Sequence, residues 1–304
     1  MSIETNTSAN TPSVAGAPFD NREADVIIRT SNNVDFYVFK RILSEASPVF
    51  YTTFTLPQAP HAQNASTSYP QVVDVAEDDA TWDTLLRVCY PTPNPVFDLN
   101  TAKEVLEAGK KYDMEVVVWY CRDGINRVVS EDPLLCFNLA YCSGFEAEAR
   151  AAAKASLHQS LQDLLHTSSR RGHYATSGPA LTVLLLYHSK SQDAALNAIN
   201  AWSTHRSSPA INGMDFVWYT NPWAHEFMAS VAASYQNTPV GGSRLIETSA
   251  DMMDAFLCNG GKSCSRCIAY IRCHIPTFLE ALREAVYQKQ SEVAVDLSAM
   301  PRFR

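Results

Sequence analysis

The chain has 304 residues, of which 46% are hydrophobic, and its formal net charge at pH 7 is −8. This length predicts about two domains, and the hydrophobic fraction is sufficient for packed cores, which excludes a wholly disordered chain. The acidic balance comes without any extended run of basic residues, so no direct binding of nucleic acid is expected. The longest compact apolar run, residues 181–187, is too short to cross a bilayer.

The N-terminal segment is rich in Ser, Thr, Asn and Pro, and we expect a disordered tail over residues 1–18. It has neither the basic start nor the apolar stretch of a signal peptide, which predicts a cytoplasmic or nuclear protein. The 8 cysteines are then expected to be reduced thiols or metal ligands rather than disulfides.

The stretch from residue 24 to residue 56 organises the N-terminal part of the chain. Two short apolar runs flank Ser31-Asn32-Asn33, and runs joined by such a turn predict a β-hairpin. The spacing of apolar residues then becomes helical, and Ser47-Pro48 interrupts it, because proline disfavours a helical residue before it. Two short helices are therefore expected, the second over residues 48–54.

This stretch also carries a resemblance to a known family. The stretch resembles the start of a BTB/POZ domain. The residues that carry the resemblance are Asp25-Val26-Ile27-Ile28, then Phe36-x-Val38-x-Lys40-x-x-Leu43-x-x-Ala46-Ser47-x-x-Phe50, and finally Phe54. The family usually has Ala at the position of Val38 and His at the position of Phe39. The overall layout is most similar to the BTB proteins of mushroom-type (basidiomycete) fungi. The resemblance implies an α+β fold, with a small, mostly antiparallel sheet flanked by helices.

A third strand and three helices are expected in the rest of this region. Asp79 or Thr81 is expected to cap the first of these helices. The second opens with Thr101-x-x-Glu104, which has the spacing of a capping box. The BTB/POZ domain is therefore expected to span residues 19–127.

Residues 128–304 are expected to form a helical C-terminal region with connecting loops. Asp132 and Pro133 mark the start of the first helix, and Gly144 is typical of its end. A helical pair directly after a BTB region resembles the BACK-type extension of adaptor proteins. Further helices are expected at residues 145–165, 180–187, 192–202, 224–235 and 245–257 and from Pro276 onward, with a strand or an extended arm at residues 292–300.

The Cys-rich segment 258–274 is the part of the chain with a pattern typical of metal sites. Cys264-x-x-Cys267 has the spacing at which two thiolates bind one tetrahedral Zn²⁺. Zinc sites usually separate two ligand pairs by about a dozen residues, and no second pair is present at that spacing. If the chain is helical from residue 265, Cys273 lies about 13 Å along the axis from Cys264, at ~1.5 Å per residue. Two interpretations stay open: zinc on Cys264 and Cys267, or no cofactor and ordinary reduced cysteines.

Sequence motifs of enzymes are absent: there is no G-x-S-x-G, no phosphate-binding P-loop and no G-x-G-x-x-G. The chain is therefore expected not to be an enzyme. The resemblance instead implies a protein–protein interaction module with other proteins as partners. Strand-exchanged BTB dimers resemble each other in having a long apolar helix before the first strand. Residues 18–23 leave room for only one turn here, so the sequence does not decide whether the chain forms a homodimer.

One version of this function is an adaptor that presents targets to a cullin-type ubiquitin ligase. The residues at stake would be Phe50, Phe54, Leu56 and Gln58. Cullin-binding BTB domains often have an apolar residue, any residue and then Glu in this loop, and the stretch here has no Glu. The alternatives are a scaffold or transcription-associated assembly protein without a ligase link, and a zinc-stabilised structural protein.

Overall fold

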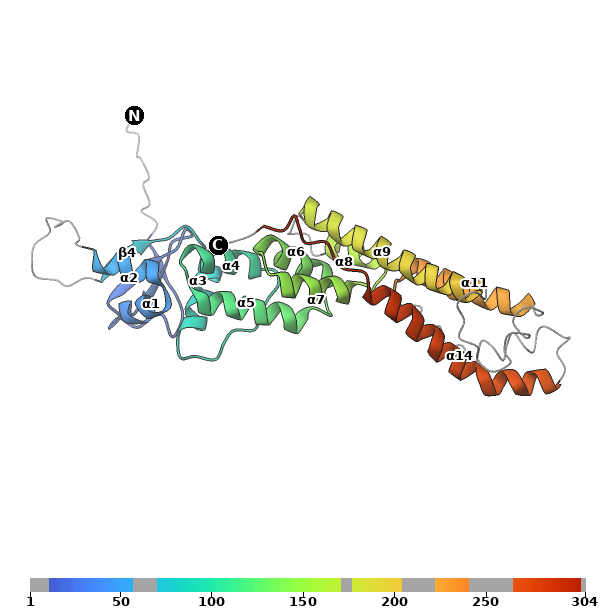
Figure 1. Cartoon of the computed structure of the whole chain (residues 1–304). Coiled ribbons are helices and arrows are strands. Elements are labelled where there is room, and N and C mark those ends of the chain that lie inside the picture. The colour runs from blue at the N-terminus through green and yellow to red at the C-terminus, as the bar shows by residue number, and fades with distance from the viewer. Residues whose placement is uncertain (1–10, 57–69, 171–176, 204–221, 241–264, 302–304) are drawn as a thin grey trace, which may run out of the picture. The chain divides into compact units, whose positions relative to one another are not determined.

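A computed structural model describes residues 11–56, 70–170, 177–203, 222–240 and 265–301 (Figure 1). The chain divides into two compact units, Met1–Ile125 and Asn126–Arg304, here called the N-terminal unit and the helical unit. The division falls close to residue 127, where the BTB region was expected to end. In the parts of the chain that the structure describes, no helix is both long and apolar enough to span a membrane.

The described part of the N-terminal unit contains a four-stranded sheet with the order β1-β3-β2-β4. Its strands are β1 (Ser13–Val14), β2 (Val26–Arg29), β3 (Val34–Val38) and β4 (Gln71–Asp74). Strands β2 and β3 are antiparallel, whereas β1 pairs with β3, and β4 with β2, in parallel. The expectation of a mostly antiparallel sheet is therefore wrong, because a helical crossover returns β4 in the direction of β2.

Strand β1 also corrects the expectation of a disordered tail over residues 1–18. Its backbone joins the sheet next to β3, and the N–H groups of Ser13 and Ala15 donate to the carbonyls of Asn33 and Asp35 at 3.1 and 2.9 Å. The Ser/Thr/Pro-rich composition suggested disorder, but these hydrogen bonds with β3 give residues 13–15 a defined conformation. The first strand of the sheet therefore lies before the first apolar run that the sequence pattern identified as a strand, at residues 26–28.

The predicted hairpin is confirmed, with β2 and β3 joined by the Ser31-Asn32-Asn33 turn. Asn33 has φ 65°, a left-handed conformation that Asn adopts more readily than most residues. Asn32 connects the turn to the third helix, since its amide donates to Asp79 Oδ1 at 2.8 Å and its oxygen accepts from the Asp79 N–H at 3.1 Å. The turn therefore fixes the sheet against a helix that is distant in sequence.

Helix α1 (Lys40–Ala46) has its N-terminus satisfied by a residue from outside the helix. Its N-cap residue, Phe39, provides no side-chain hydrogen bond. Instead, Asp25 Oδ1 accepts from the Lys40 N–H at 2.7 Å. The carboxylate thus serves as a cap from the start of β2, and it also interacts favourably with the positive end of the helix dipole.

We expect replacement of Asp25 by alanine to destabilise the N-terminal unit by roughly 1–2 kcal/mol, the usual cost of losing a helix cap. Asp25→Asn keeps an acceptor oxygen and should lose less. Urea denaturation followed by circular dichroism measures both, with Asp20→Ala as a control at an exposed carboxylate. Equal losses for Asp25→Ala and Asp20→Ala would contradict the capping role.

The other helices of this unit lie close to their predicted positions. They are α2 (Pro48–Thr55), α3 (Asp79–Cys89), α4 (Ala102–Lys111) and α5 (Glu115–Val128). Two predicted caps are wrong. Asp78, not Asp79 or Thr81, caps α3, because its Oδ1 accepts from the Thr81 N–H at 2.9 Å. The Thr101 capping box does not form, because the Thr101 hydroxyl donates to the Asp98 carbonyl at 3.4 Å instead.

The helical unit begins as predicted. Its described helices are α6 (Pro133–Ser143), α7 (Glu146–Ser156), α8 (Leu161–Arg170), α9 (Gly178–Ser203), α11 (Pro222–Asn237) and α14 (Ser265–Ser291). Asp132 Oδ1 caps α6 by accepting from the Leu135 N–H at 3.0 Å, and Gly144 ends the helix with φ 76°. Both signals were evident in the sequence.

Four later helix predictions are wrong in their boundaries. The expected helix at residues 145–165 is two helices, because Ser160 caps α8 by accepting from the Asp163 N–H at 3.1 Å. The expected helices at 180–187 and 192–202 are instead the single helix α9, and no Gly or Pro separates them. Helix α14 begins at Ser265 rather than at Pro276, which lies inside the helix, and Figure 1 shows α14 bending along its length. Proline bends a helix because it removes one backbone hydrogen bond.

Helix α9 packs against both α11 and α14 (Figure 1). Their shared core consists of apolar side chains from all three helices: Ala195, Ala198, Ile199, Phe227, Met228, Val231, Tyr235, Phe278, Leu279, Leu282 and Val286. Residues 292–301 then leave α14 without regular secondary structure, and Val295 is buried. This segment is an extended arm, which was one of the two predicted forms. The expected helix at residues 245–257 lies outside the described residues.

Candidate protein-binding surface

Helix α2 is anchored at its first residue to the end of α4. Ser47 is the N-cap, and its Oγ accepts from the Phe50 N–H at 3.1 Å. The same hydroxyl donates to the backbone carbonyl of Tyr112. Pro48 occupies the first helical position, where its missing N–H costs nothing. The orientation of α2 is therefore determined by contacts far apart in sequence.

An aromatic cluster lies directly beneath α2. The Phe50 ring stacks on Tyr112 at 5.0 Å between centroids and meets the edge of Trp82 at 5.9 Å. Phe50 is only 2% exposed, and Trp82 is fully buried. Phe50, which the sequence suggested as a binding residue, is therefore a core residue that supports the surface without forming it.

Glu77 stabilises the far side of this cluster. Its carboxylate accepts from Lys111 Nζ and from the Tyr112 hydroxyl, both at 2.7 Å. Burial and this hydrogen bond to Glu77 raise the pKa of Tyr112 to about 12. Although burial disfavours the Glu77 carboxylate, the hydrogen bonds from Lys111 and Tyr112 hold the pKa of Glu77 below its usual value. The ring of Tyr112 is thus fixed in place under Phe50.

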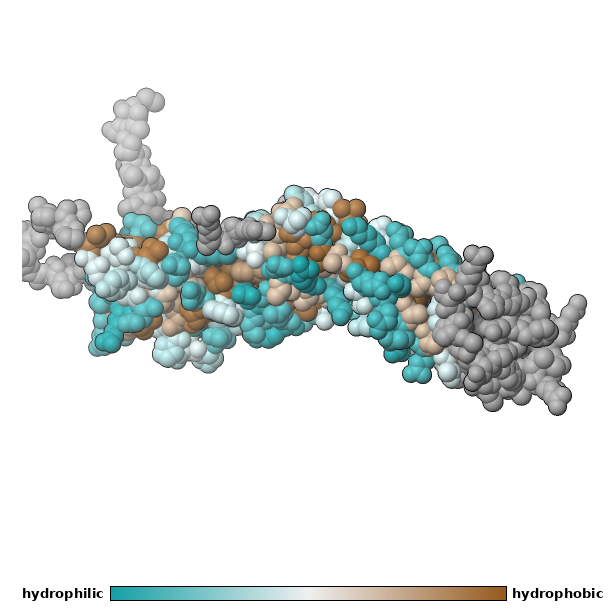
Figure 2. Space-filling view, viewed as in Figure 1, coloured by the Kyte–Doolittle hydropathy of each residue, from teal (hydrophilic) through white to brown (hydrophobic). Residues whose placement is uncertain are grey.

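Helix α2 and its C-terminal end expose large uncharged side chains on both sides of the buried Phe50. Tyr51 is 58% exposed, Leu56 is 60% exposed, and Val49 is also exposed. We call Val49, Tyr51 and Leu56 the α2 surface. The helix contains no charged residue, and its three threonine hydroxyls donate to carbonyls of the preceding turn. In Figure 2, brown and pale residues lie over α2.

The predicted binding residues differ in their exposure to solvent. Leu56 is exposed, whereas Phe54 is half-buried, with its ring 5.7 Å from Phe50 and the Lys40 Nζ 5.6 Å above it. Gln58 lies outside the described residues. Sequence reasoning missed Tyr51 in particular. The helical spacing gave no clear signal, because Tyr51 lies three residues before Phe54 and therefore next to the apolar pair at positions 50 and 54 rather than opposite to it.

A second exposed aromatic lies on α5. Trp119 is 65% exposed, and the Arg122 guanidinium lies 5.2 Å from the centre of its ring. Val116, one helical turn earlier, is also exposed. Sequence reasoning singled out neither residue. The buried side of this helix includes Val117 and Cys121, and at ~100° per residue Val116 and Trp119 lie on the opposite side, which is the signal that could have found them.

The proposed zinc ligands gain no support from the described residues. Cys264 lies outside them, and among the residues described no group of three or more potential metal ligands lies together. Because α14 begins at Ser265, Cys267 and Cys273 are separated along the helix by about 9 Å, at ~1.5 Å per residue. Zinc on Cys264 and Cys267 stays a hypothesis that metal analysis of the purified chain tests, since well under one zinc per chain would exclude it.

Comparison with known protein families gives a match over the N-terminal part of the chain. The family profile of the BTB/POZ domain matches residues 18–127. A search of curated proteins found no match to this sequence. The matched residues include the whole hairpin, the α2 surface and the aromatic cluster beneath it, and BTB/POZ domains are protein–protein interaction modules. Residues 18–127 therefore form a BTB/POZ domain, and a helical C-terminal region follows it.

Proposed function

We propose that the chain is an adaptor that acts in the cytoplasm or the nucleus. Its BTB/POZ domain docks on a cullin-type scaffold through the α2 surface, and its helical unit, which resembles a BACK-type extension, binds the protein to be presented. The observation that carries this proposal is the exposure of Val49, Tyr51 and Leu56 on a helix without charged residues.

The chemistry of the α2 surface fits a docking site. Tyrosine side chains concentrate binding energy at protein interfaces, because they bury a large area and lose little conformational freedom. The α2 surface carries no charged side chain, so covering it with a partner avoids the desolvation free energy that burying a charge would cost. The underlying cluster of Phe50, Trp82 and Tyr112 keeps the helix rigid, so little order has to be gained on binding.

The test is titration calorimetry of the purified chain with a cullin N-terminal domain. We expect micromolar or tighter binding, and a loss of at least about tenfold for Leu56→Asp and for Tyr51→Ala, which corresponds to ~1.4 kcal/mol per decade. Val96→Asp is the matched control, because Val96 is 94% exposed on a loop of the same domain and away from α2. Phe54→Ala is less suitable, since its ring packs on Phe50 and its loss would disturb the fold.

The second candidate is a scaffold or assembly protein without a ligase link. The sequence observation in its favour is the absence of Glu from residues 54–58. If calorimetry shows no binding to the cullin domain, or equal binding by wild type and Leu56→Asp, the adaptor proposal fails. Affinity capture with wild type and Leu56→Asp in parallel would then identify partners that depend on the α2 surface.

A further inference from the structure

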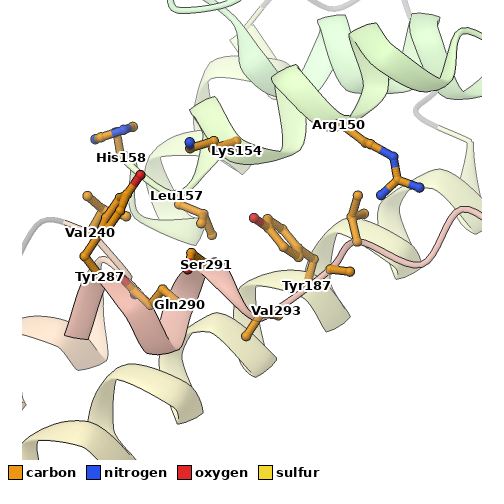
Figure 3. Close-up of a pocket in the computed structure, with 12 residues that line it drawn as sticks. Arg150, Lys154, Leu157, His158, Tyr187, Val240, Tyr287, Gln290, Ser291 and Val293 are labelled. Carbon is orange, nitrogen blue, oxygen red and sulfur yellow. The ribbon is translucent and has the colours of Figure 1, made fainter. Parts of the chain in front are cut away.

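A cavity of about 380 Å³ lies inside the helical unit (Figure 3). Helix α7 forms one wall, and α9, α14 and the extended arm contribute the others. Its volume falls within the range of small-molecule sites, which is about 300–1,000 Å³. The cavity is partly open to solvent, so a ligand could enter without unfolding the unit.

The wall formed by α7 is basic. Arg150 and Lys154 line the cavity from α7, where their spacing of four residues places them on one side of the helix, and His158 lines it two residues after the helix ends. Figure 3 shows Arg150 projecting from the green helix toward the arm, and Lys154 pointing the other way, toward the side where His158 lies. No carboxylate lines the cavity among the residues described. This concentration of positive charge contrasts with the net charge of −8 of the whole chain.

The two cations differ in what they already bind. Arg150 Nη2 contacts Glu146 Oε1 at 2.6 Å, so part of its charge is compensated. Lys154 Nζ makes no ion pair or hydrogen bond with any described residue. An ammonium group that lines a largely apolar cavity without a counter-charge is therefore available to an incoming anion.

The remaining lining is mostly apolar. Leu157, Val240, Val293 and Val295 contribute aliphatic surface, and Tyr187 and Tyr287 contribute rings. The polar side chains of α14 are already engaged, since the Gln290 amide donates to the Pro239 carbonyl and Ser291 Oγ donates to the Gln288 carbonyl at 2.7 Å. The cavity thus combines cationic groups along one wall with an apolar interior.

We propose that this cavity binds a small organic anion with an apolar body, such as a medium-chain carboxylate or an alkyl phosphate. Lys154 would hold the anionic head, while the aliphatic and aromatic side chains would enclose the body. Charged hydrogen bonds to a carboxylate or phosphate are stronger than neutral ones, so the head determines orientation and selectivity. This inference concerns the helical unit and does not depend on which partner the α2 surface binds.

The test uses octanoate and octyl phosphate as probes, with octan-1-ol as the neutral probe of the same body. We expect calorimetry on the full chain to detect both anions, to show at least tenfold weaker binding of the alcohol, and to show weaker anion binding as salt is added. The better of the two anions identifies the preferred head. Equal binding of anion and alcohol would overturn the proposal, since it would indicate non-specific hydrophobic association.

Three variants separate the site from the fold. Lys154→Gln is expected to weaken anion binding about tenfold, whereas Lys190→Gln removes the same charge from an exposed position outside the cavity and should change nothing. Ala294 lines the cavity but is exposed, so Ala294→Trp can fill the space without disturbing the core, and it should abolish binding with an unchanged melting temperature. Unchanged octanoate affinity in both Lys154→Gln and Ala294→Trp would exclude this cavity as the site.

Discussion

Replacing Phe50 with alanine is expected to destabilise the N-terminal unit by roughly 3–5 kcal/mol, the usual cost of truncating a buried aromatic residue. The Phe50 ring contacts Trp82, Tyr112 and Phe54, with centroid distances of 5.9, 5.0 and 5.7 Å. Its removal leaves a cavity at the point where α2, α3 and the end of α4 meet. The surrounding helices are held by Ser47 and Glu77, so they cannot collapse to fill it.

The next residue supplies the matched control for this experiment. Tyr51→Ala removes an aromatic side chain from the same helix, but one that is 58% exposed, and it should change the unfolding free energy by less than about 0.5 kcal/mol. Hydrogen exchange followed by mass spectrometry along a urea series reports on each unit separately. A loss at Phe50→Ala no larger than that at Tyr51→Ala would refute the core assignment. In that case Tyr51→Ala could not serve as a binding variant in the calorimetry, because its effect on binding could arise from a change in folding stability.

Acid is expected to destabilise the helical unit through His188. This side chain is 1% exposed, and its Nε2 lies 2.7 Å from Ser156 Oγ. Ser156 Oγ already donates to the Ala153 carbonyl at 2.7 Å, so the imidazole donates from Nε2 to the hydroxyl oxygen. Nδ1 is buried and has no hydrogen-bond partner among the described residues. Protonation would therefore add a charge and a donor where nothing can accept it.

The sign of the pH effect follows from the two pKa values. Burial lowers the pKa of His188 to about 4 in the folded chain, from its ordinary value of 6.5. Between these values the unfolded state binds more protons than the folded state, so stability falls as the pH falls. Stability is fully present above pH 6.5, and the loss between pH 7 and pH 4 is roughly 3 kcal/mol, at ~1.36 kcal/mol per pH unit.

His188→Gln keeps an amide donor near Ser156 and cannot titrate. We expect the stability of the helical unit to depend less on pH in this variant, with the difference from wild type changing by roughly 3 kcal/mol between pH 7 and pH 4. Urea titrations with the hydrogen-exchange readout at several pH values measure it. His166→Gln is the control, because His166 is exposed on α8. Parallel pH curves for wild type and His188→Gln would show that another group causes the acid sensitivity.

Local sequence signals predicted those parts of the fold that depend on neighbouring residues. The Ser31-Asn32-Asn33 turn, the break at Ser47-Pro48 and the cap at Asp132 all act within a few residues, and the structure confirms each of them. The family pattern correctly indicated the BTB/POZ domain for the same reason, since its residues lie in one continuous stretch.

Errors arose where residue spacing or composition indicated a local structure that the hydrogen bonds of the folded chain do not form. Thr101 and Glu104 have the spacing of a capping box, but the Thr101 hydroxyl bonds to Asp98 instead. Ser160 divides an alanine-rich stretch that has high helix propensity throughout, and its cap is a single hydrogen bond that composition does not reveal. Pro276 suggested a helix start, whereas α14 begins at Ser265 and continues through the proline.

The sequence by itself determined that the chain begins with a BTB/POZ domain, continues as helices and carries no known catalytic motif. Only the tertiary structure decided that Phe50 supports the surface from within while Tyr51 lies on it, because burial depends on which helices meet. The basic cavity was equally invisible, since Lys154, Tyr187 and Val293 come from separate elements. The periodicity of the sequence shows which residues share a face of a helix, but only the packing of the folded chain shows whether that face contacts another element or solvent.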